Sequence, residues 1–420
     1  MLLNTKDLIS MNNKRIAKNT FMLYLMTIAK IVLPLVLLPY LTRVLTKDAF
    51  GIVNYVKALM QYMQLFIDFG FMLSATKDIV NCCGDKEKLN RVIGDTTLAR
   101  MFLAMIGFII VIVLILFMPI LKDNVIFTLL SYIPIALSCL FMDFLFRGLE
   151  QMHVITIRFI AARGIATIMT LFVVNNDDDL LWIPLLEIIG TLIAVLLVFL
   201  EIRERRLSVK FTSISVALQK LRESAVYFFS DMATSAFHAL NTVMVGIFMK
   251  ASQVADWSLC LQVAMGIQAL YTPITGGVYP YMVKNKDMKL IKKILKICMP
   301  LVLCGVVILY FLSPWILRML GGEKYMGITP LLRSFIPLIV ISFPAMLFGW
   351  PCLGAINKQR ENSLTTIFTA LAQCAGLVFL LSVNKFTLLN LAFLRGVTEF
   401  LMFSMRFWLC IKYKNEFCKN

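Results

Sequence analysis

Charged side chains stand singly inside long apolar runs of this 420-residue sequence. An ionisable residue within a membrane span costs at least about 2.5 kcal/mol on insertion scales, so by default it faces a cavity or a partner. Cations in such a cavity would bind an anion such as a phosphate or a diphosphate, and carboxylates could exchange a proton or a sodium ion. The isolated charges are Lys30, Lys57, Asp68, Arg100, Asp143, Glu187, Asp231, Arg395, Glu399 and Arg406.

Four cations are predicted to line a substrate-binding cavity: Lys30, Lys57, Arg43 and Arg395. Lys30 and Lys57 fall at interior positions of the first two apolar runs, whereas Arg43 ends the first run. Snorkelling of a long side chain toward the membrane interface is the alternative for these three cations. Arg395 lies four residues before Glu399 on one helix face, so mutual neutralisation is the alternative for that pair.

Four carboxylates are candidates for coupling transport to H⁺ or Na⁺: Asp68, Glu187, Asp231 and Glu399. A buried hydrogen bond between helices is the alternative for Glu187 and Asp231. No other cofactor is expected. The two histidines provide little for a proton relay or a His-rich metal site, and the adjacent Cys82 and Cys83 lack a second metal-binding pair.

A third group of charges lies at the predicted inner end of the fourth and fifth spans: Asp143, Arg147, Glu150, Arg158 and Arg163. Arg158 is predicted to form a salt bridge with Glu150 across the short turn between these spans. This group would then act as a cytoplasmic gate that breaks when the inner mouth opens. A solvated charged loop is the alternative.

The elements that must position these charges are membrane-spanning helices. Hydrophobic residues make up 60% of the chain and charged residues 15%, and the mean hydropathy is +0.83. This composition excludes a soluble enzyme, a disulfide scaffold and a disordered protein. Apolar runs of about 20 residues predict twelve spans in an all-α membrane protein. They lie near 20–42, 49–71, 94–118, 125–146, 154–174, 180–201, 225–249, 257–282, 292–313, 331–354, 363–382 and 387–411.

Lysine and arginine predict the orientation of these spans. With the N-terminus inside, the cytoplasmic segments hold 28 of these residues and the external loops hold 8. Both termini are therefore predicted to be cytoplasmic. The asymmetry explains most of the net charge of +17, so nucleic-acid binding is not expected. The first 19 residues are polar and show no cleavable signal peptide. No disulfide is expected, because no cysteine falls in an external loop.

The longest cytoplasmic loop divides the chain into two halves of six spans. The predicted segments are a cytoplasmic N-terminus (1–19), an N-terminal lobe (20–201), a linker (202–224), a C-terminal lobe (225–411) and a cytoplasmic tail (412–420). Six spans per half make any repeat parallel, a geometry found in alternating-access transporters. No G-x-x-x-x-G-K-[ST] phosphate loop is present, so the chain carries no ATPase of its own.

Three segments carry a resemblance to a known family. They are the basic start KRIAKNTFMLYLMTIAKIVLPLVLLPYLTRVLTKDAFGIVNY, the DFG at Asp68 to Gly70, and FRGLEQ between spans four and five. In these segments, in its length and in its two-lobe division, the chain resembles Wzx-type O-unit flippases. These form the polysaccharide transporter branch of the multidrug/oligosaccharidyl-lipid/polysaccharide exporter superfamily.

The resemblance implies a MATE-like fold of two six-helix lobes with a cationic central cavity. It implies transfer of an undecaprenyl-diphosphate-linked oligosaccharide, such as an O-antigen repeat unit, from the inner to the outer leaflet of a bacterial plasma membrane. Membrane lipids, a polysaccharide polymerase and a chain-length regulator would be partners. A multidrug or cation antiporter of the same fold, which would prefer an acidic cavity, and a lipid II flippase are the rival readings.

Overall fold

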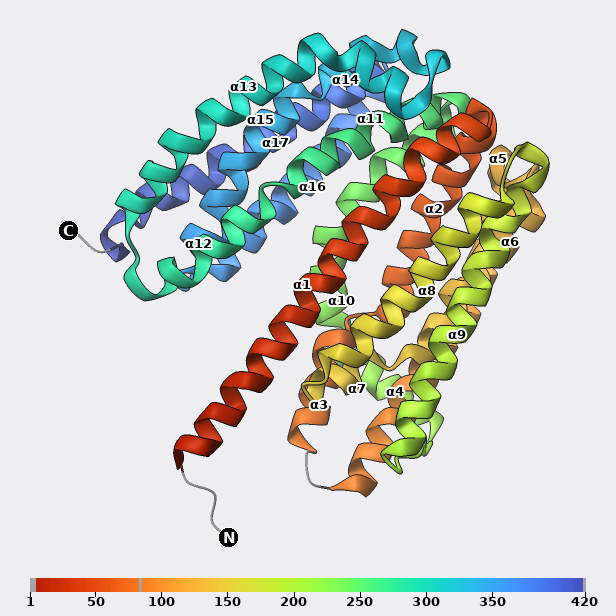
Figure 1. Cartoon of the computed structure of the whole chain (residues 1–420), viewed down its shortest axis with the longest axis vertical. Helices are drawn as coiled ribbons and strands as arrows, with labels where there is room; N and C mark the ends of the chain where they lie inside the picture. Colours follow the sequence, from red (N-terminus) through yellow and green to blue (C-terminus); the bar gives the residue numbers. More distant parts are fainter. Residues whose placement is uncertain (1–4, 83–84, 418–420) are drawn as a thin grey trace. The chain divides into compact units, whose positions relative to one another are not determined.

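The computed structural model describes residues 5–82 and 85–417, and for residues 5–17, 226, 229–231 and 233–238 it describes the backbone alone. Within that part of the chain every regular element is helical (Figure 1). Nine helices among the described residues are long and apolar enough to cross a membrane, and a shorter apolar stretch spans Ala239–Phe248. The predicted all-helical membrane protein is confirmed, whereas the number of twelve spans stays a prediction.

Three predicted spans are not among those nine helices of the described residues, yet their backbones are helical. Polar and charged residues lower the hydropathy of the second span, and a turn at Leu270 and Tyr271 divides the eighth. These spans correspond to α2 (Lys47–Asp68), α10 (Ile214–Phe248), and α11 (Ala251–Ala269) with α12 (Thr272–Asn285).

The chain forms two compact units, Met1–Ala239 and Leu240–Asn420, which divide within α10. In the first unit α8 packs against α1 and α9, while α6 contacts α2, α4 and α9 (Figure 1). Besides α2 and the start of α10, its elements are α1 (Thr5–Val44), α3 (Phe71–Asn81), α4 (Lys86–Phe117), α5 (Pro119–Lys122), α6 (Val125–Leu137), η1 (Ser138–Phe141), α7 (Asp143–Gly148), α8 (Met152–Val173), η2 (Asp177–Leu181) and α9 (Trp182–Glu204).

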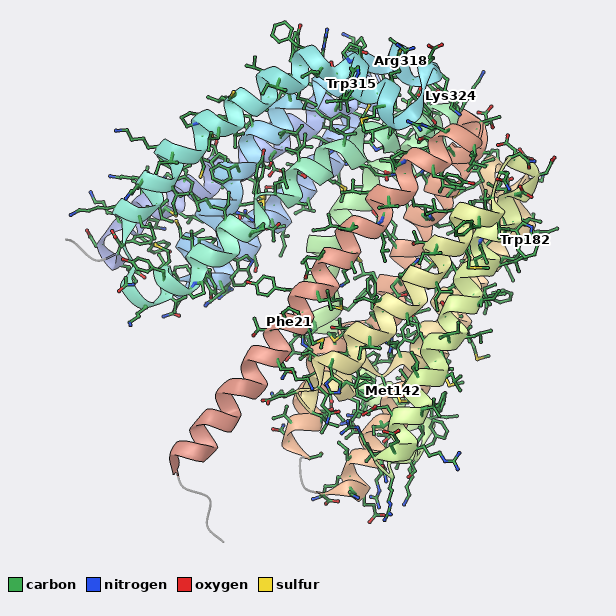
Figure 2. The ribbon with its side chains drawn as sticks, viewed as in Figure 1. Phe21, Met142, Trp182, Trp315, Arg318 and Lys324 are labelled. Carbon is green, nitrogen blue, oxygen red and sulfur yellow. The ribbon has the colours of Figure 1, made fainter. Side chains whose placement is uncertain are left out.

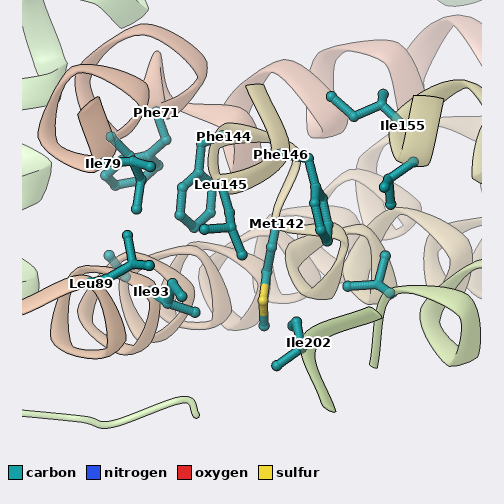
Figure 3. Close-up of a cluster of buried hydrophobic side chains, with 14 of the residues drawn as sticks. Phe71, Ile79, Leu89, Ile93, Met142, Phe144, Leu145, Phe146, Ile155 and Ile202 are labelled. Carbon is teal, nitrogen blue, oxygen red and sulfur yellow. The ribbon is translucent and has the colours of Figure 1, made fainter. Parts of the chain in front are cut away.

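An apolar cluster holds the short helix α7 within the first unit. Met142, Phe144 and Phe146 are buried there against Phe71 and Ile79 of α3, together with residues of α4, α8 and α9 (Figure 3). Close packing of such large side chains leaves little freedom for rotation. The cluster therefore fixes the direction in which α7 presents its polar residues.

The segment between α9 and α10 is docked on α4 by hydrogen bonds. The backbone N–H of Ser208 donates to the Asn90 side chain at 2.9 Å, and the N–H and hydroxyl of Thr212 donate to Asp95 at 2.8 and 2.9 Å. A Cβ at Gly94 would lie 2.0 Å from the carbonyl oxygen of Lys210. Glycine at this position thus permits the close approach of the two backbones.

In the second unit α17 packs against α15 and α16, and α13 packs against α15 (Figure 1). Besides α11, α12 and the end of α10, its elements are α13 (Met288–Gly321), η3 (Glu323–Ile328), α14 (Thr329–Ser334), α15 (Ile336–Leu347), the π-helical η4 (Phe348–Gly354), α16 (Gln359–Ser382), α17 (Leu388–Lys412) and η5 (Lys414–Glu416).

Arg406 of α17 stabilises the irregular junction of α15 and η4. Gly349 interrupts the helical backbone there with a ψ of −113°. The Arg406 guanidinium donates to the carbonyl of Ala345 at 2.8 Å and to the hydroxyls of Thr365 and Thr366 at 3.2 and 3.0 Å. Arg406 thus supplies a donor where the helix is distorted, as buried backbone carbonyls require.

Candidate functional site

A helix break places Asp68 inside the first unit. α2 ends at Asp68, and both Phe69 (φ 39°) and Gly70 (φ 74°) adopt the left-handed conformation before α3 begins. A Cβ at Gly70 would lie 2.6 Å from the Cβ of Tyr227, so the position has neither the conformation nor the space for a larger residue. The DFG segment singled out in the sequence is this break.

Asp68 is paired with an arginine that the sequence did not assign to a site. The Arg100 guanidinium on α4 donates to Asp68 Oδ1 at 2.7 Å, and its other terminal nitrogen donates to the carbonyl of Cys139 at 3.4 Å. Gln64, one turn earlier on α2, donates to Asp68 Oδ2 at 3.0 Å. The signal for this pairing was the presence of opposite isolated charges in two apolar runs.

A second helix break presents Asp143. Met142 has a φ of 52° between η1 and α7, so the chain changes direction directly before this carboxylate. Arg158 Nη2 donates to both oxygens of Asp143 at 2.7 Å, and the guanidinium lies 3.8 Å from the centre of the Phe141 ring. The Arg158 side chain is only 6% exposed. This ion pair is therefore largely withdrawn from water.

The two ion pairs border one small cavity. A space of about 70 Å³, large enough for water, is lined by Gln64, Asp68, Phe71, Met72, Arg100, Phe141, Asp143 and Phe144. Lys30 of α1 is exposed, lies 5.4 Å from the centre of the Phe159 ring, and interacts electrostatically with Asp143 and Arg158. The group formed by Lys30 and the two pairs carries three cations against two carboxylates.

A neighbouring group lies further along α8. Arg163 Nη1 donates to Glu187 Oε1 of α9 at 2.9 Å. Lys57 of α2 is half-buried and interacts electrostatically with both residues. Arg163 is about 7.5 Å beyond Arg158 at 1.5 Å per helical residue. Lys30 and Lys57 are therefore each associated with one of two successive ion pairs of α8.

The remaining residues of the predicted cavity and gate lie apart from these two groups. Arg43 is exposed at the end of α1, about 20 Å along the helix from Lys30 at 1.5 Å per residue. Arg147 is exposed on α7, and Glu150 has a φ of 56° in the turn before α8. The predicted ion pair between Glu150 and Arg158 is not formed, because Asp143 occupies the Arg158 guanidinium.

The charges predicted in the C-terminal half are buried on α17 of the second unit. Arg395 and Glu399 are 3% and 5% exposed, one turn apart, and Glu399 also interacts electrostatically with Arg406. No residue whose side chain the structure describes donates a hydrogen bond to the Glu399 carboxylate. Arg395 belongs to a different unit from Lys30 and Lys57. The side chain of Asp231 lies outside the described residues.

A chain of neutral polar side chains next to Glu399 was not predicted. Gln373 donates to Asn241 Oδ1 at 2.8 Å, and the Thr398 hydroxyl donates to Gln373 Oε1 at 2.8 Å. All three are buried, and they link α10, α16 and α17. Neutral amides and hydroxyls do not stand out in the sequence as isolated charges do.

Over the residues that are described, no three His, Cys, Asp or Glu side chains gather into a possible metal site.

Comparison with solved structures defines the class of fold. An inward-facing multidrug resistance MATE family transporter aligns with a TM-score of 0.65 at 12% identity, covering 95% of this chain and 98% of that one. The lipid II flippase MurJ, in an inward closed conformation, aligns with a TM-score of 0.70 at 13% identity, covering 96% and 94%. The fold is therefore MATE-like, as expected.

Sequence comparison then identifies the family. The model of the polysaccharide biosynthesis protein family matches residues 16–286. A protein of Shigella dysenteriae named "Putative O-antigen transporter" is 25% identical over 357 residues, covering 84% of this chain and 89% of the relative. A protein of Escherichia coli (strain K12) with the same name is 24% identical over 390 residues, covering 90% and 92%. The chain belongs to the polysaccharide biosynthesis protein family.

Proposed function

We propose that the chain is a flippase that moves an undecaprenyl-diphosphate-linked oligosaccharide from the inner to the outer leaflet of a bacterial plasma membrane. Its family, the names of its two relatives and its MurJ-like fold support a membrane transporter of lipid-linked polysaccharide rather than an enzyme. No covalent bond changes in this process, so the task of the protein is to shelter a charged, sugar-bearing head from hydrocarbon.

The observation that carries the proposal is the excess of positive charge inside the first unit. Five cations lie in or beside its two charge groups, against three carboxylates: Lys30, Lys57, Arg100, Arg158 and Arg163, with Asp68, Asp143 and Glu187. Each arginine has its own carboxylate. The ammonium groups of Lys30 and Lys57 form no ion pair or hydrogen bond with any residue whose side chain is described, so they remain available to an anion.

In the proposed mechanism the diphosphate binds Lys30 and Lys57. The ion pairs Asp143–Arg158 and Glu187–Arg163 hold the neighbouring guanidinium groups in place and limit the positive charge, so that the head is not retained too tightly to be released. The polyprenyl tail stays in lipid while the two units alternate between inward and outward access. An acidic cavity, which a cationic drug would need, does not match this balance of charge.

We further propose that an ion gradient drives the cycle through one of the four predicted carboxylates. Asp68 and Glu187 are already bonded to arginines. Glu399 is buried, and no described side chain donates a hydrogen bond to it. Glu399 is therefore the preferred residue for reversible binding of H⁺ or Na⁺, with Asp231 as the second candidate.

The test is complementation of a host strain that lacks this chain. The variant K30Q/K57Q removes both free ammonium groups, K30R/K57R keeps their charge, and K86Q/K88Q removes the same charge from the exposed start of α4 as a matched control. We expect K30Q/K57Q to insert normally but to lose surface polysaccharide and to accumulate lipid-linked units, while the other two variants complement. Normal surface polysaccharide with K30Q/K57Q would contradict the assignment.

A further inference from the structure

One face of α13 begins with a stripe of lysines. Lys289, Lys292, Lys293 and Lys296 have the spacing i, i+3, i+4, i+7, so they share one face of the helix. All four side chains are exposed. The sequence from 288 to 322 contains no aspartate or glutamate, and the preceding Asp287 is used as the helix cap, accepting the N–H of Lys289 at 2.8 Å.

The orientation of this lysine stripe is fixed by the opposite face of α13. Ile291 is fully buried, and Leu290, Ile294 and Leu295 pack against a cluster that includes Phe348 and Cys352 of the second unit. The helix cannot rotate the lysines inward without exposing this apolar surface. The stripe is therefore a permanent outer feature of the unit.

The same face continues as apolar surface toward the other end of α13. Leu303, Val307 and Phe311 follow the lysines at helical spacing and are 47%, 55% and 72% exposed. On a membrane-spanning helix, we expect such an exposed apolar face to contact lipid. The lysine stripe lies on this same face, outside the packed interior of its unit.

The length of α13 places the lysines at the level of the lipid headgroups. Trp315 and Arg318 lie near one end of the helix (Figure 2), and aromatic and basic residues of this kind mark a membrane interface. Lys296 precedes Trp315 by 19 residues, which is about 29 Å of helix and matches a hydrocarbon core of about 30 Å. Lys289, Lys292 and Lys293 lie a further 5–10 Å outward, roughly the depth of the headgroup layer.

The basic residues at the start of α4 in the first unit differ from the lysine stripe because they form ion pairs with nearby carboxylates. There Lys88 lies 3.3 Å from Asp85, and Arg91 lies 2.9 Å from Glu87. The four lysines of α13 have no carboxylate within ion-pair distance among the residues that the structure describes. Their charge is available to an external anion.

We propose that the lysine stripe Lys289, Lys292, Lys293 and Lys296 is a binding surface for acidic phospholipid headgroups of the cytoplasmic leaflet. Its ligand is the phosphodiester of a lipid with net negative charge, since clustered lysines directly beside a spanning helix attract anionic lipid. Its position on the lipid-facing side argues for this ligand over an acidic segment of a cytosolic protein. The contact anchors the second unit at a set depth in the membrane.

The experiment measures which phospholipid remains bound to the purified full-length chain. The protein is equilibrated in detergent with equal amounts of phosphatidylglycerol and phosphatidylcholine, and bound lipid is counted by native mass spectrometry. The variants are K293Q, the quadruple glutamine variant of the stripe and the quadruple arginine variant. K77Q/K86Q/K88Q/K210Q, which removes four exposed lysines of the first unit, is the control.

We expect the wild type to prefer the acidic lipid and to lose this preference as salt is added. K293Q should lower the preference about fivefold at low salt, and the quadruple glutamine variant should abolish it. The arginine and control variants should bind as the wild type does. An unchanged preference in the quadruple glutamine variant, or an equal loss in the control, would overturn the proposal. K293Q alone decides the matter if the quadruple variant does not fold.

Discussion

Removing Arg158 is expected to destabilise the first unit strongly. R158Q leaves the Asp143 carboxylate, which is 21% exposed, without the guanidinium that contacts both of its oxygens at 2.7 Å. Loss of one partner of a buried ion pair costs about 3–5 kcal/mol. The stacking of the guanidinium on Phe141 is lost as well, which adds about 0.5–2 kcal/mol. We expect a loss of at least about 3 kcal/mol.

The pairwise term is separated by a double-mutant cycle. D143N/R158Q removes both charges, so no carboxylate remains buried alone, and it should be less destabilised than the sum of D143N and R158Q by about 1–3 kcal/mol. R158K keeps the charge but loses the planar guanidinium that lies over the Phe141 ring, so it should fall between the wild type and R158Q.

The free energy of unfolding is measured by titrating the purified chain in mixed micelles with dodecyl sulfate, following tryptophan fluorescence. Surface polysaccharide is measured in parallel in the complemented host. Two results would refute the reasoning: R158Q as stable as the wild type, or additive effects of D143N and R158Q. Strict additivity would mean that the two side chains do not act on each other in the folded protein.

Three further results follow from the same structure. G94A should weaken docking of the linker and expose it to limited proteolysis, since the added Cβ would lie 2.0 Å from the Lys210 carbonyl oxygen. R406K should lower thermal stability, because the single nitrogen of lysine cannot occupy the three positions from which the guanidinium donates to the Ala345 carbonyl and to the Thr365 and Thr366 hydroxyls; an unchanged melting temperature would contradict this role. Hydrogen bonds from the N–H and the side chain of Lys88 hold the pKa of Asp85 below its usual range. Its stabilising contribution is therefore present above pH ~4 and lost as pH falls through the lower folded pKa, a loss that thermal melts of D85N should not show.

The sequence is most informative about where helices cross the membrane and which residues are exceptional within them. Apolar runs of about 20 residues leave little choice but spanning helices. Asp68 and Asp143 were singled out because a charge in such a run needs a partner or a cavity, and Arg158 because it belongs to the charged group at the inner end of spans four and five. The structure finds partners for all three within one unit.

The sequence did not indicate which carboxylate pairs with Arg158. Arg158 is close in sequence to Glu150, yet it binds Asp143, because the left-handed backbone at Met142 aims α7 toward α8. A positive φ at a methionine has no local sequence signal, since glycine or asparagine usually marks such a position. It depends on the apolar cluster around Phe144 and Phe146 that holds the turn.

Hydrogen bonds between neutral polar side chains could not be predicted from the sequence either. Gln373, Asn241 and Thr398 form a buried chain across three helices, but each residue type is common and uncharged. Their burial is tolerable because each side chain satisfies the next. Only the packing of α10, α16 and α17 brings them together.

The most direct test of the central claim is transfer of a lipid-linked sugar by the purified chain. Proteoliposomes are loaded with a fluorescent undecaprenyl-diphosphate oligosaccharide, and a membrane-impermeant quencher reports how much of it lies in the outer leaflet over time. We predict that the wild type equilibrates the label between leaflets, that K30Q/K57Q does not, and that K86Q/K88Q behaves as the wild type. Label that stays in its original leaflet with folded wild-type protein, under imposed H⁺ and Na⁺ gradients, would contradict the proposed function.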